Sequence, residues 1–432
     1  MTQIRTWLDF ALQQFAAESY LHRFLSGELQ LDQVLQLGNN NQPGALPNAS
    51  LLPGNTRMAD QQITEFTQRY QIVNHHANDA SGFSATLLFD TATNSYTLSF
   101  RSTEYKNQNE GGDYERDGAN FPSFTGADGE ILTNGFAFGQ LAAMEQYYAD
   151  LKASGTLPVG ATLNVTGYSL GGHLATVFTE LHATEIQHTY TFNGPGRGIV
   201  TGISGQSDPP NPLDAAPIQA MLTRLTEVLR NPEAAPAPVE GDPFADIFTQ
   251  AKALHDADPS WNPFGAGSAA NLYQDPRYVW ARHAMGLDYA TSAVSQTEVQ
   301  GGAFDLITQL VGHATHGDQE LVANSGIHAV PTTVFIEDQP NLDGFGGFFG
   351  LNGDFGTTHS ITLIVDSLAL MEAFQTVDPN VTQTSLGQIF SAASNQIGSG
   401  FVGTFFSLAP LEGEGGGEGG VRGSACLLQV AA

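Results

Sequence analysis

The chain of 432 residues is poor in cysteine, in basic side chains and in long apolar runs, and each scarcity excludes something. Its one cysteine, Cys426, cannot form a disulfide within the chain. Only 15 Lys and Arg stand against 44 Asp and Glu, a formal net charge of −29, so the surface would repel a phosphate backbone and we expect no nucleic-acid partner. No apolar run approaches the roughly 18 residues that a bilayer requires, so we expect no transmembrane segment.

The first 24 residues carry charges among their apolar side chains. Arg5, Asp9, Glu18 and Arg23 interrupt the segment, which therefore indicates an amphipathic helix and not a cleavable signal peptide. An acidic surface suits solubility in an extracellular or saline setting. We therefore expect an extracellular location, reached without a signal peptide, in preference to a cytoplasmic one.

The pattern of apolar residues predicts three parts. Residues 1–75 form a helical segment packed on the core, and residues 76–410 form an α/β domain. Residues 202–290, rich in Pro and Ala, are too long for a structureless loop and indicate an inserted helical cap. Residues 411–432 are rich in Gly and Glu and cannot bury a core, so we expect them to be disordered.

Within the α/β domain, strands and helices are expected to alternate as in a parallel sheet covered by helices. Two strands joined by a hairpin turn come first, followed by helix, strand, helix and strand, with further strands and a last helix after the cap. The expected strands are 84–89, 95–100, 163–165, 188–192, 293–299 and 332–336, and the expected helices are 56–70, 136–151, 170–181 and 361–374.

Residues 167–171, Gly-Tyr-Ser-Leu-Gly, fall between an expected strand and an expected helix. This is the context in which Gly-x-Ser-x-Gly forms a tight turn that holds a serine nucleophile up for attack. The positive end of the helix dipole and the N–H of Leu170 would lie beside Ser169, where they could stabilise an oxyanion. Ser169 is therefore the candidate nucleophile.

The extended segment 166–175, Thr-Gly-Tyr-Ser-Leu-Gly-Gly-His-Leu-Ala, resembles the nucleophile turn of the class 3 lipase family, the fungal-type lipases and related bacterial phospholipases. Residues 100–103, Phe-Arg-Ser-Thr, resemble the family's Phe-Arg-Gly-Ser/Thr. Residues 134–136 and 192–195 resemble two further motifs in the same order. The resemblance implies an α/β-hydrolase fold with a mostly parallel central sheet and an inserted lid.

The resemblance also implies roles for residues near the nucleophile. The last residue of the Phe-Arg-Gly-Ser/Thr motif closes the oxyanion hole, and Ser102 stands here where the family has glycine. Either Thr103 or Ser102 could supply the second oxyanion donor beside Leu170, and we favour Thr103. Tyr168 replaces the histidine that usually precedes the nucleophile and is assigned to substrate binding.

A hydrolase of this fold needs an acid and then a histidine downstream of the serine. We choose His359, because it follows a glycine-rich loop and immediately precedes the last expected helix. His173 is four residues after Ser169 and is better placed to pack inside the helix. His313 and His316 lack a glutamate and a third ligand at useful spacing, so we expect no metal there.

The acid has two candidates. Asp305 lies in a loop similar to the one that carries the acid in class 3 lipases, and it is our choice. Asp338, at the end of the expected strand 332–336, is the alternative.

The function implied is that of a carboxylic ester hydrolase, lipase-like or phospholipase A1-like, acting on lipid esters at a lipid–water interface through Ser169, Asp305 and His359. The alternatives are a short-chain esterase or acyltransferase and a non-catalytic lipid-binding protein. No cofactor is required. Acidic loops at 113–117 and 343–354 could bind Ca²⁺, although solvated loops are the favoured interpretation. We expect a monomer or a small homo-oligomer.

Overall fold

The computed structural model describes the N-terminal half of the chain almost continuously and a few segments of the remainder. In the part of the chain described, no helix has both the length and the apolar character needed to cross a membrane. The described residues are 2–39, 57–79, 81–104, 112–118, 126–134, 137–182, 184–192, 194, 199–201, 288–291, 327–329, 361–382, 384–386 and 388–389.

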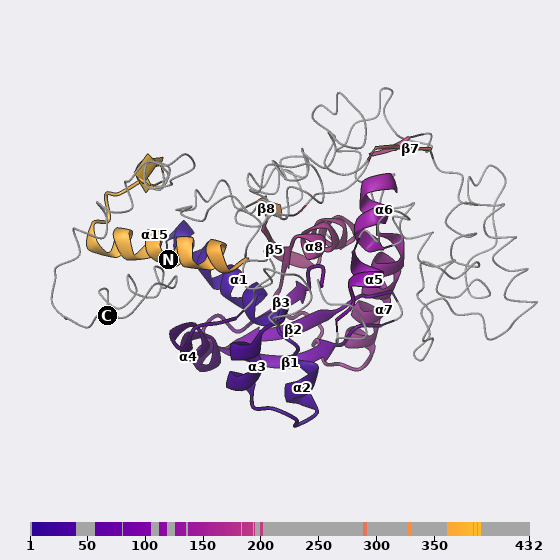
Figure 1. Cartoon of the computed structure of the whole chain (residues 1–432), viewed down its shortest axis with the longest axis horizontal. Coiled ribbons are helices and arrows are strands. Elements are labelled where there is room, and N and C mark those ends of the chain that lie inside the picture. The colour runs from indigo at the N-terminus through magenta and orange to yellow at the C-terminus, as the bar shows by residue number, and fades with distance from the viewer. Residues whose placement is uncertain are drawn as a thin grey trace, which may run out of the picture.

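These segments contain both helices and strands (Figure 1). Four helices come first, namely α1 (Gln3–Ala17), α2 (His22–Leu25), α3 (Leu31–Leu37) and α4 (Asp60–Arg69). They are followed by β1 (Tyr70–His76), β2 (Ala85–Asp90), β3 (Ser95–Phe100), α5 (Tyr114–Asp117), α6 (Ala127–Asn134), α7 (Phe138–Ala153), β4 (Leu163–Tyr168), α8 (Leu170–Leu181) and β5 (Ile186–Phe192). The later elements are β6 (Ile199–Thr201), β7 (Asp288–Thr291), β8 (Ile327–Ala329) and α15 (Ile361–Val377).

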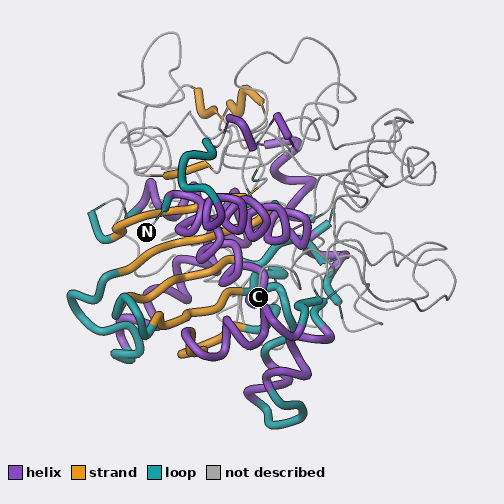
Figure 2. Tube along the Cα trace, turned by 90° about the vertical axis from the view of Figure 1, so that its left-hand side faces the viewer, coloured by secondary structure: helices purple, strands orange, loops and turns teal. Residues whose placement is uncertain are grey.

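Six of these strands form one sheet in the order β1-β2-β3-β4-β5-β8. The first three strands pair antiparallel, and β3, β4, β5 and β8 pair parallel. Figure 2 shows the strands lying side by side with helices packed against them. A separate pair, β6 and β7, is antiparallel. The chain is thus a mixed α/β protein with a mostly parallel sheet flanked by helices.

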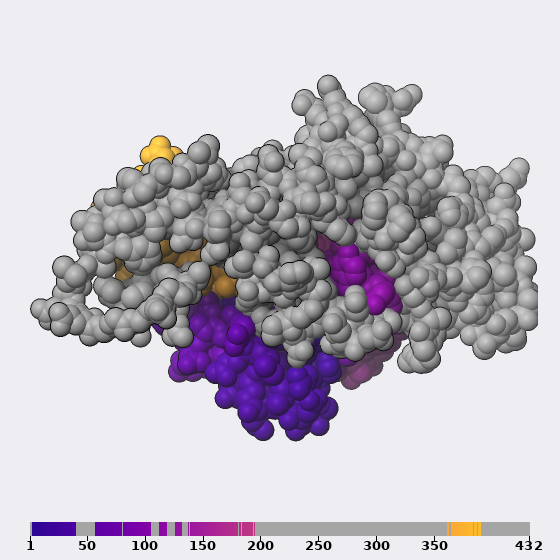
Figure 3. Space-filling model, viewed as in Figure 1, coloured from indigo at the N-terminus to yellow at the C-terminus, as the bar shows by residue number. Residues whose placement is uncertain are grey.

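The two faces of the sheet bury different side chains, because successive residues of a strand point to opposite faces. Leu87, Leu98 and Val165 pack with α7 and α8 in one cluster. Leu88, on the other face, belongs to a second cluster that includes residues of α1, α4 and α15. The space-filling view shows the N-terminal residues, coloured indigo, at the bottom of the molecule (Figure 3).

Ion pairs join α1 to its neighbours in this second layer. Arg69, at the end of α4, donates to Asp9 of α1 and to Asp90 at the end of β2, both at 2.8 Å. Arg5 reaches Glu372 of α15 at 3.1 Å. The N-terminal helix is therefore bound to the core through both apolar packing and charge.

The elements predicted around the serine are present, with boundaries shifted by a few residues. The expected hairpin is β2 and β3, and the expected helix 56–70 is the shorter α4. The first 24 residues do not form one helix, since α1 ends at Ala17 and the chain turns before α2. Strand β1 was not predicted. The expected strands 293–299 and 332–336 and the cap helices lie outside the described residues.

Candidate functional site

Ser169 sits between the end of β4 and the start of α8 in an unusual backbone conformation. Its φ is 54° and its ψ is −123°. Among the non-glycine residues of the described part, only Asn94 shares a positive φ. Such a conformation costs on the order of 1–3 kcal/mol and persists only where its surroundings impose it, which makes it a marker of a functional position.

Three glycines allow the start of α8 to approach the sheet closely enough to impose this turn. A Cβ on Gly167 would lie 2.0 Å from the carbonyl oxygen of Gly171, and one on Gly171 would lie 2.1 Å from that of Phe100. A Cβ on Gly172 would lie 2.6 Å from Cα of Gly194, beyond β5. Each of these obstacles is backbone, so no side chain could move aside to make room.

The backbone N–H groups around Ser169 differ in whether the turn and α8 offer them a hydrogen-bond acceptor. The Ser169 N–H donates to the carbonyl oxygen of Phe192 at 3.0 Å, and the Ser169 carbonyl accepts from Gly172 N–H at 2.8 Å. Leu170 and Gly171 precede the first hydrogen bond of the helix, so α8 itself offers their N–H groups no acceptor. The Ser169 side chain makes no capping bond to α8 and is half-buried, although Tyr168 and Leu170 beside it are buried.

The topology brings the candidate oxyanion residues to one edge of the sheet. Strands β3 and β4 are parallel, with Phe100 opposite Gly167, so the segment after β3 and the turn after β4 leave from the same edge. Gly171 is also bordered by the carbonyl oxygen of Arg101. Thr103 therefore follows the strand end that the start of α8 touches.

Three of the four residues after β3 are bound to a carboxylate from another part of the chain, and the fourth pairs with a carboxylate inside the segment. Arg101 pairs with Glu104, and Thr103 Oγ1 donates to Asp128 of α6 at 2.8 Å. Ser102 Oγ donates to the Glu18 carboxylate at 2.6 Å, and the Glu104 N–H donates to the Asp117 carboxylate at 3.2 Å. Residues 101–104 are all buried. This segment, which we call the β3 loop, is thus fixed along its whole length.

Burial raises the pKa of three of these acids, because it removes water from their charged form. Burial raises the pKa of Glu18 to about 7, against the opposing effect of hydrogen bonds from Ser102 and Gln14. Desolvation raises the pKa of Asp128 to about 7, against the Thr103 hydroxyl. Burial also raises the pKa of Asp117, and the neighbouring Asp113 and Glu104 add to the effect.

His173 and Tyr168 pack in the interior. His173 is fully buried in α8, and its Nε2 accepts a hydrogen bond from Ala137 N–H at 3.2 Å. This bond fixes an imidazole whose proton is on Nδ1 and ties α8 to the start of α7. Tyr168 is 3% exposed and belongs to the cluster that contains α1 and α15. A substrate contact for Tyr168 stays a prediction.

The other predicted site residues, Asp305, Asp338 and His359, lie outside the described residues, as do the acidic loop 343–354 and all of the expected cap except its last three residues, which belong to β7. Residues 113–117 are not the solvated loop that was expected, because 114–117 form the helix α5 and the Asp113 and Asp117 carboxylates are buried against protein donors. Asp113 accepts from Arg116, and Asp117 accepts from Gln140 Nε2 at 2.8 Å. Over the described residues, no group of three or more His, Cys, Asp or Glu side chains is arranged to hold a metal ion.

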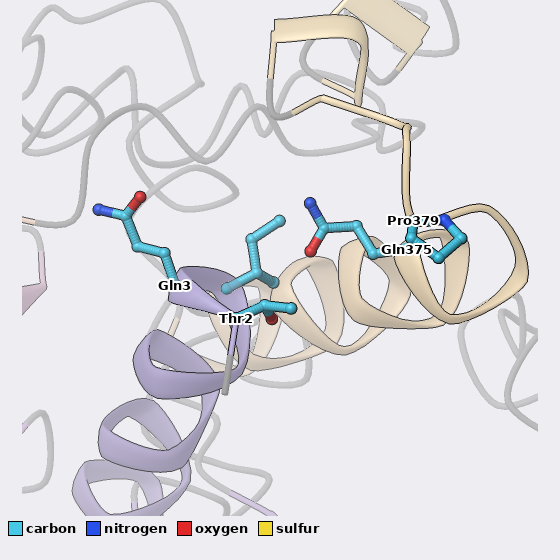
Figure 4. A pocket seen from close by; sticks show the side chains of 5 residues that line it. Thr2, Gln3, Gln375 and Pro379 are labelled. Carbon is cyan, nitrogen blue, oxygen red and sulfur yellow. The ribbon is translucent and has the colours of Figure 1, made fainter.

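A hollow in the described surface lies elsewhere. It is formed by the N-terminal end of α1 and the end of α15, with Thr2 and Gln3 on one side and Gln375 and Pro379 on the other (Figure 4). None of the residues that line it belongs to β3, β4 or α8. It is therefore not part of the site around Ser169.

Neither a protein-family model nor a curated protein sequence matches the chain. Solved structures that it resembles include lipase II from Rhizopus niveus, with 16% identity and a TM-score of 0.27 over 45% of this chain and 63% of that one. For a lipase from Rhizopus microsporus var. chinensis the identity is 14% and the TM-score 0.27, and the match covers 46% of this chain and 59% of that one. For a propeptide complex of Rhizomucor miehei lipase the identity is 14% and the TM-score 0.25, and the match covers 45% of this chain and 53% of that one.

The match spans less than two thirds of each of these fungal chains. The function of this chain must therefore follow from its own residues and geometry.

A methyl group at Gly171 should disrupt the turn, because the obstacle is the backbone of β3. We expect Gly171→Ala to lower the free energy of unfolding by about 3 kcal/mol or more, measured by urea denaturation. Gly160→Ala is the matched control, since Gly160 has a φ of 77° and open space around the new Cβ. It should cost only the strain of a left-handed residue, about 1–2 kcal/mol. Equal losses in the two variants would contradict the close approach.

Glu18→Gln should make stability less dependent on pH. Because burial raises the pKa of Glu18 from 4.5 to about 7, the folded chain holds a proton in this interval that the unfolded chain has released. The free energy of unfolding therefore falls as pH rises from about 4.5 to about 7, and the amide of the variant, which does not titrate, would remove that contribution. Urea denaturation at pH 5 and pH 8 should show a smaller difference in the variant. An unchanged difference would contradict a buried Glu18 with a raised pKa.

Proposed function

We propose that this chain is a serine ester hydrolase with an α/β-hydrolase fold and Ser169 as its nucleophile. The observation that carries the proposal is the positive φ of Ser169, held between a parallel strand and a helix by glycines that tolerate no Cβ. A serine with no exceptional task would adopt the extended conformation usual at a helix start and cap the helix with its oxygen. Ser169 does neither.

The same geometry supports an oxyanion hole. The N–H groups at the start of α8 and the positive end of its dipole favour a negative charge beside Ser169. The β3 loop leaves the adjacent strand at the same edge, and its Thr103 side chain is already bound to Asp128. We assign the N–H groups of Leu170 and Thr103 to the oxyanion.

The reaction is acyl transfer. Ser169 Oγ attacks the ester carbonyl carbon while His359 takes its proton, and the proton then passes to the leaving alcohol as the ester C–O bond breaks. Water, deprotonated by His359, attacks the acyl-enzyme and releases the carboxylic acid together with Ser169. The proposed acylation and deacylation steps need no cofactor. His359 precedes α15 by two residues, and Ile361, the first residue of α15, is buried in the same cluster as Tyr168 and Phe192.

The acid that orients His359 is either Asp305 or Asp338. Site residues of a parallel sheet gather beyond the carboxyl ends of its strands. β8 pairs parallel with β5, and Asp338 follows β8 in the chain, whereas Asp305 precedes it. The sequence resemblance favours Asp305, but the position of β8 favours Asp338, and we propose Asp338 on this topological ground.

The substrate class follows from the motifs around the serine, which resemble those of class 3 lipases. We propose a lipid ester, either a triacylglycerol or the sn-1 ester of a phospholipid. Residues 202–290 would form the lid or the wall of the acyl pocket.

Replacing Ser169 with alanine should abolish hydrolysis. Fatty-acid release from triolein and from phosphatidylcholine should fall by about 10⁴-fold or more, because no other group on the proposed path can form the acyl-enzyme. Ser154→Ala, at an exposed serine after α7, is the matched control and should keep full activity.

The outcomes separate the alternatives. Release from short soluble esters alone would replace the lipid substrate by a small ester while keeping Ser169. Release that persists in Ser169→Ala would rule out the proposed nucleophile.

Replacing the catalytic aspartate with asparagine should remove the carboxylate that orients His359 without changing the size of the side chain. We expect Asp338→Asn to lower kcat by about 10³- to 10⁴-fold, and Asp305→Asn to leave kcat within about threefold of the wild type. Steady-state kinetics on one ester substrate decides between them. The reverse pattern would establish Asp305 as the acid and overturn the topological argument.

A further inference from the structure

The C-terminal end of α1 is bonded directly to the β3 loop. Glu18 accepts Ser102 Oγ at 2.6 Å and the Ser102 N–H at 3.2 Å, and it also accepts Gln14 Nε2 at 2.6 Å. Glu18 and Ser102 are separated by 84 residues of sequence. Glu18 has no exposed surface and Ser102 only 7%.

Gln14, one helical turn before Glu18, extends this contact back along β3. Its Nε2 also donates to the carbonyl oxygen of Phe100 at 2.8 Å, and its Oε1 accepts Ser99 Oγ at 2.8 Å. Residues four apart lie on one face of a helix, so both side chains reach the same strand end. Together they bind three of the four residues from Ser99 to Ser102.

The contact depends on Ser102, the position at which this chain departs from the glycine of the class 3 lipase motif. Glycine would keep the N–H but would have no hydroxyl to donate. A carboxylate that is fully buried needs several donors to offset the loss of water. Ser102 supplies two of them, which makes the pair Glu18 and Ser102 a mutually dependent unit.

We propose that Glu18 and Gln14 are positioning residues for the oxyanion hole. Glu18 holds Ser102 and Gln14 holds Phe100 and Glu18, so that the Thr103 N–H next to Ser102 is fixed toward the substrate oxyanion. This inference rests on the proposed function and extends the site to a helix outside every motif around the serine. Thr103 is held on its other side by Asp128. The β3 loop is thereby clamped between α1 and α6.

Losing the bonds from Glu18 and Gln14 should weaken stabilisation of the transition state. The oxyanion forms only as the serine attacks, so a displaced donor weakens stabilisation of the transition state more than binding of the ground state. A displacement of about 1 Å can cost on the order of 100-fold in rate. Loss of the anchor should therefore lower kcat and leave KM nearly unchanged, whereas a general loss of folded protein would also lower the unfolding temperature in proportion.

The test is a double-mutant cycle in the full chain with Glu18→Gln, Ser102→Ala and their combination, measured on one ester substrate. We expect each single variant to lower kcat by about 10-fold, with KM within about twofold, and the double variant to lose little more than either. Gln13→Ala is the matched control, because Gln13 is equally buried in α1 but bonds to Asp9 of its own helix. It should keep kcat and KM.

Hydrogen exchange gives a readout that does not need activity. Peptides covering residues 99–104 should exchange faster in both anchor variants and at the wild-type rate in Gln13→Ala. Ser102→Ala alone carries the test if Glu18→Gln does not fold. Wild-type kcat in Glu18→Gln and Ser102→Ala, or losses that simply multiply in the double variant, would overturn the positioning role while Ser169→Ala remains inactive. Full activity in Ser169→Ala would instead overturn the proposed function itself.

Discussion

The close approach of α8 to the sheet is the constraint on which the candidate site depends. Gly171 lies against the carbonyl oxygen of Phe100, and Gly167 lies against that of Gly171, at separations that no Cβ could share. This contact fixes the height of the helix above the strands, and the short turn between them then forces Ser169 into a positive φ. The strain at one residue is thus offset by packing that involves β3, β4 and the end of β5.

A second constraint acts on the neighbouring strand. The β3 loop would be an ordinary connection, yet Arg101, Ser102, Thr103 and Glu104 are all buried and each is bonded to a carboxylate. Buried carboxylates are costly unless donors surround them. The loop supplies those donors and is immobilised in return. A hydrolase benefits from such rigidity because an oxyanion hole acts through preorganisation and not through induced movement.

Local sequence patterns predicted the elements that surround the serine, since alternation in β4 and helical spacing in α7 and α8 reflect which face each side chain buries. β1 was missed because it is an edge strand whose side chains are mostly half-buried, so Tyr70–His76 shows no alternation. The bond between Glu18 and Ser102 could not be predicted, because nothing local links residues so distant in the chain. The acid and the base stay predictions for a similar reason. They lie far from Ser169 in sequence, and only a resemblance or the strand order argues for them.

An activated Ser169 should react covalently with a fluorophosphonate. The most direct measurement is mass spectrometry of the chain after reaction with a fluorophosphonate, with digestion to locate the adduct. We expect a single adduct per chain, on the peptide that contains Ser169. An unmodified chain, or an adduct on a different residue, would contradict it.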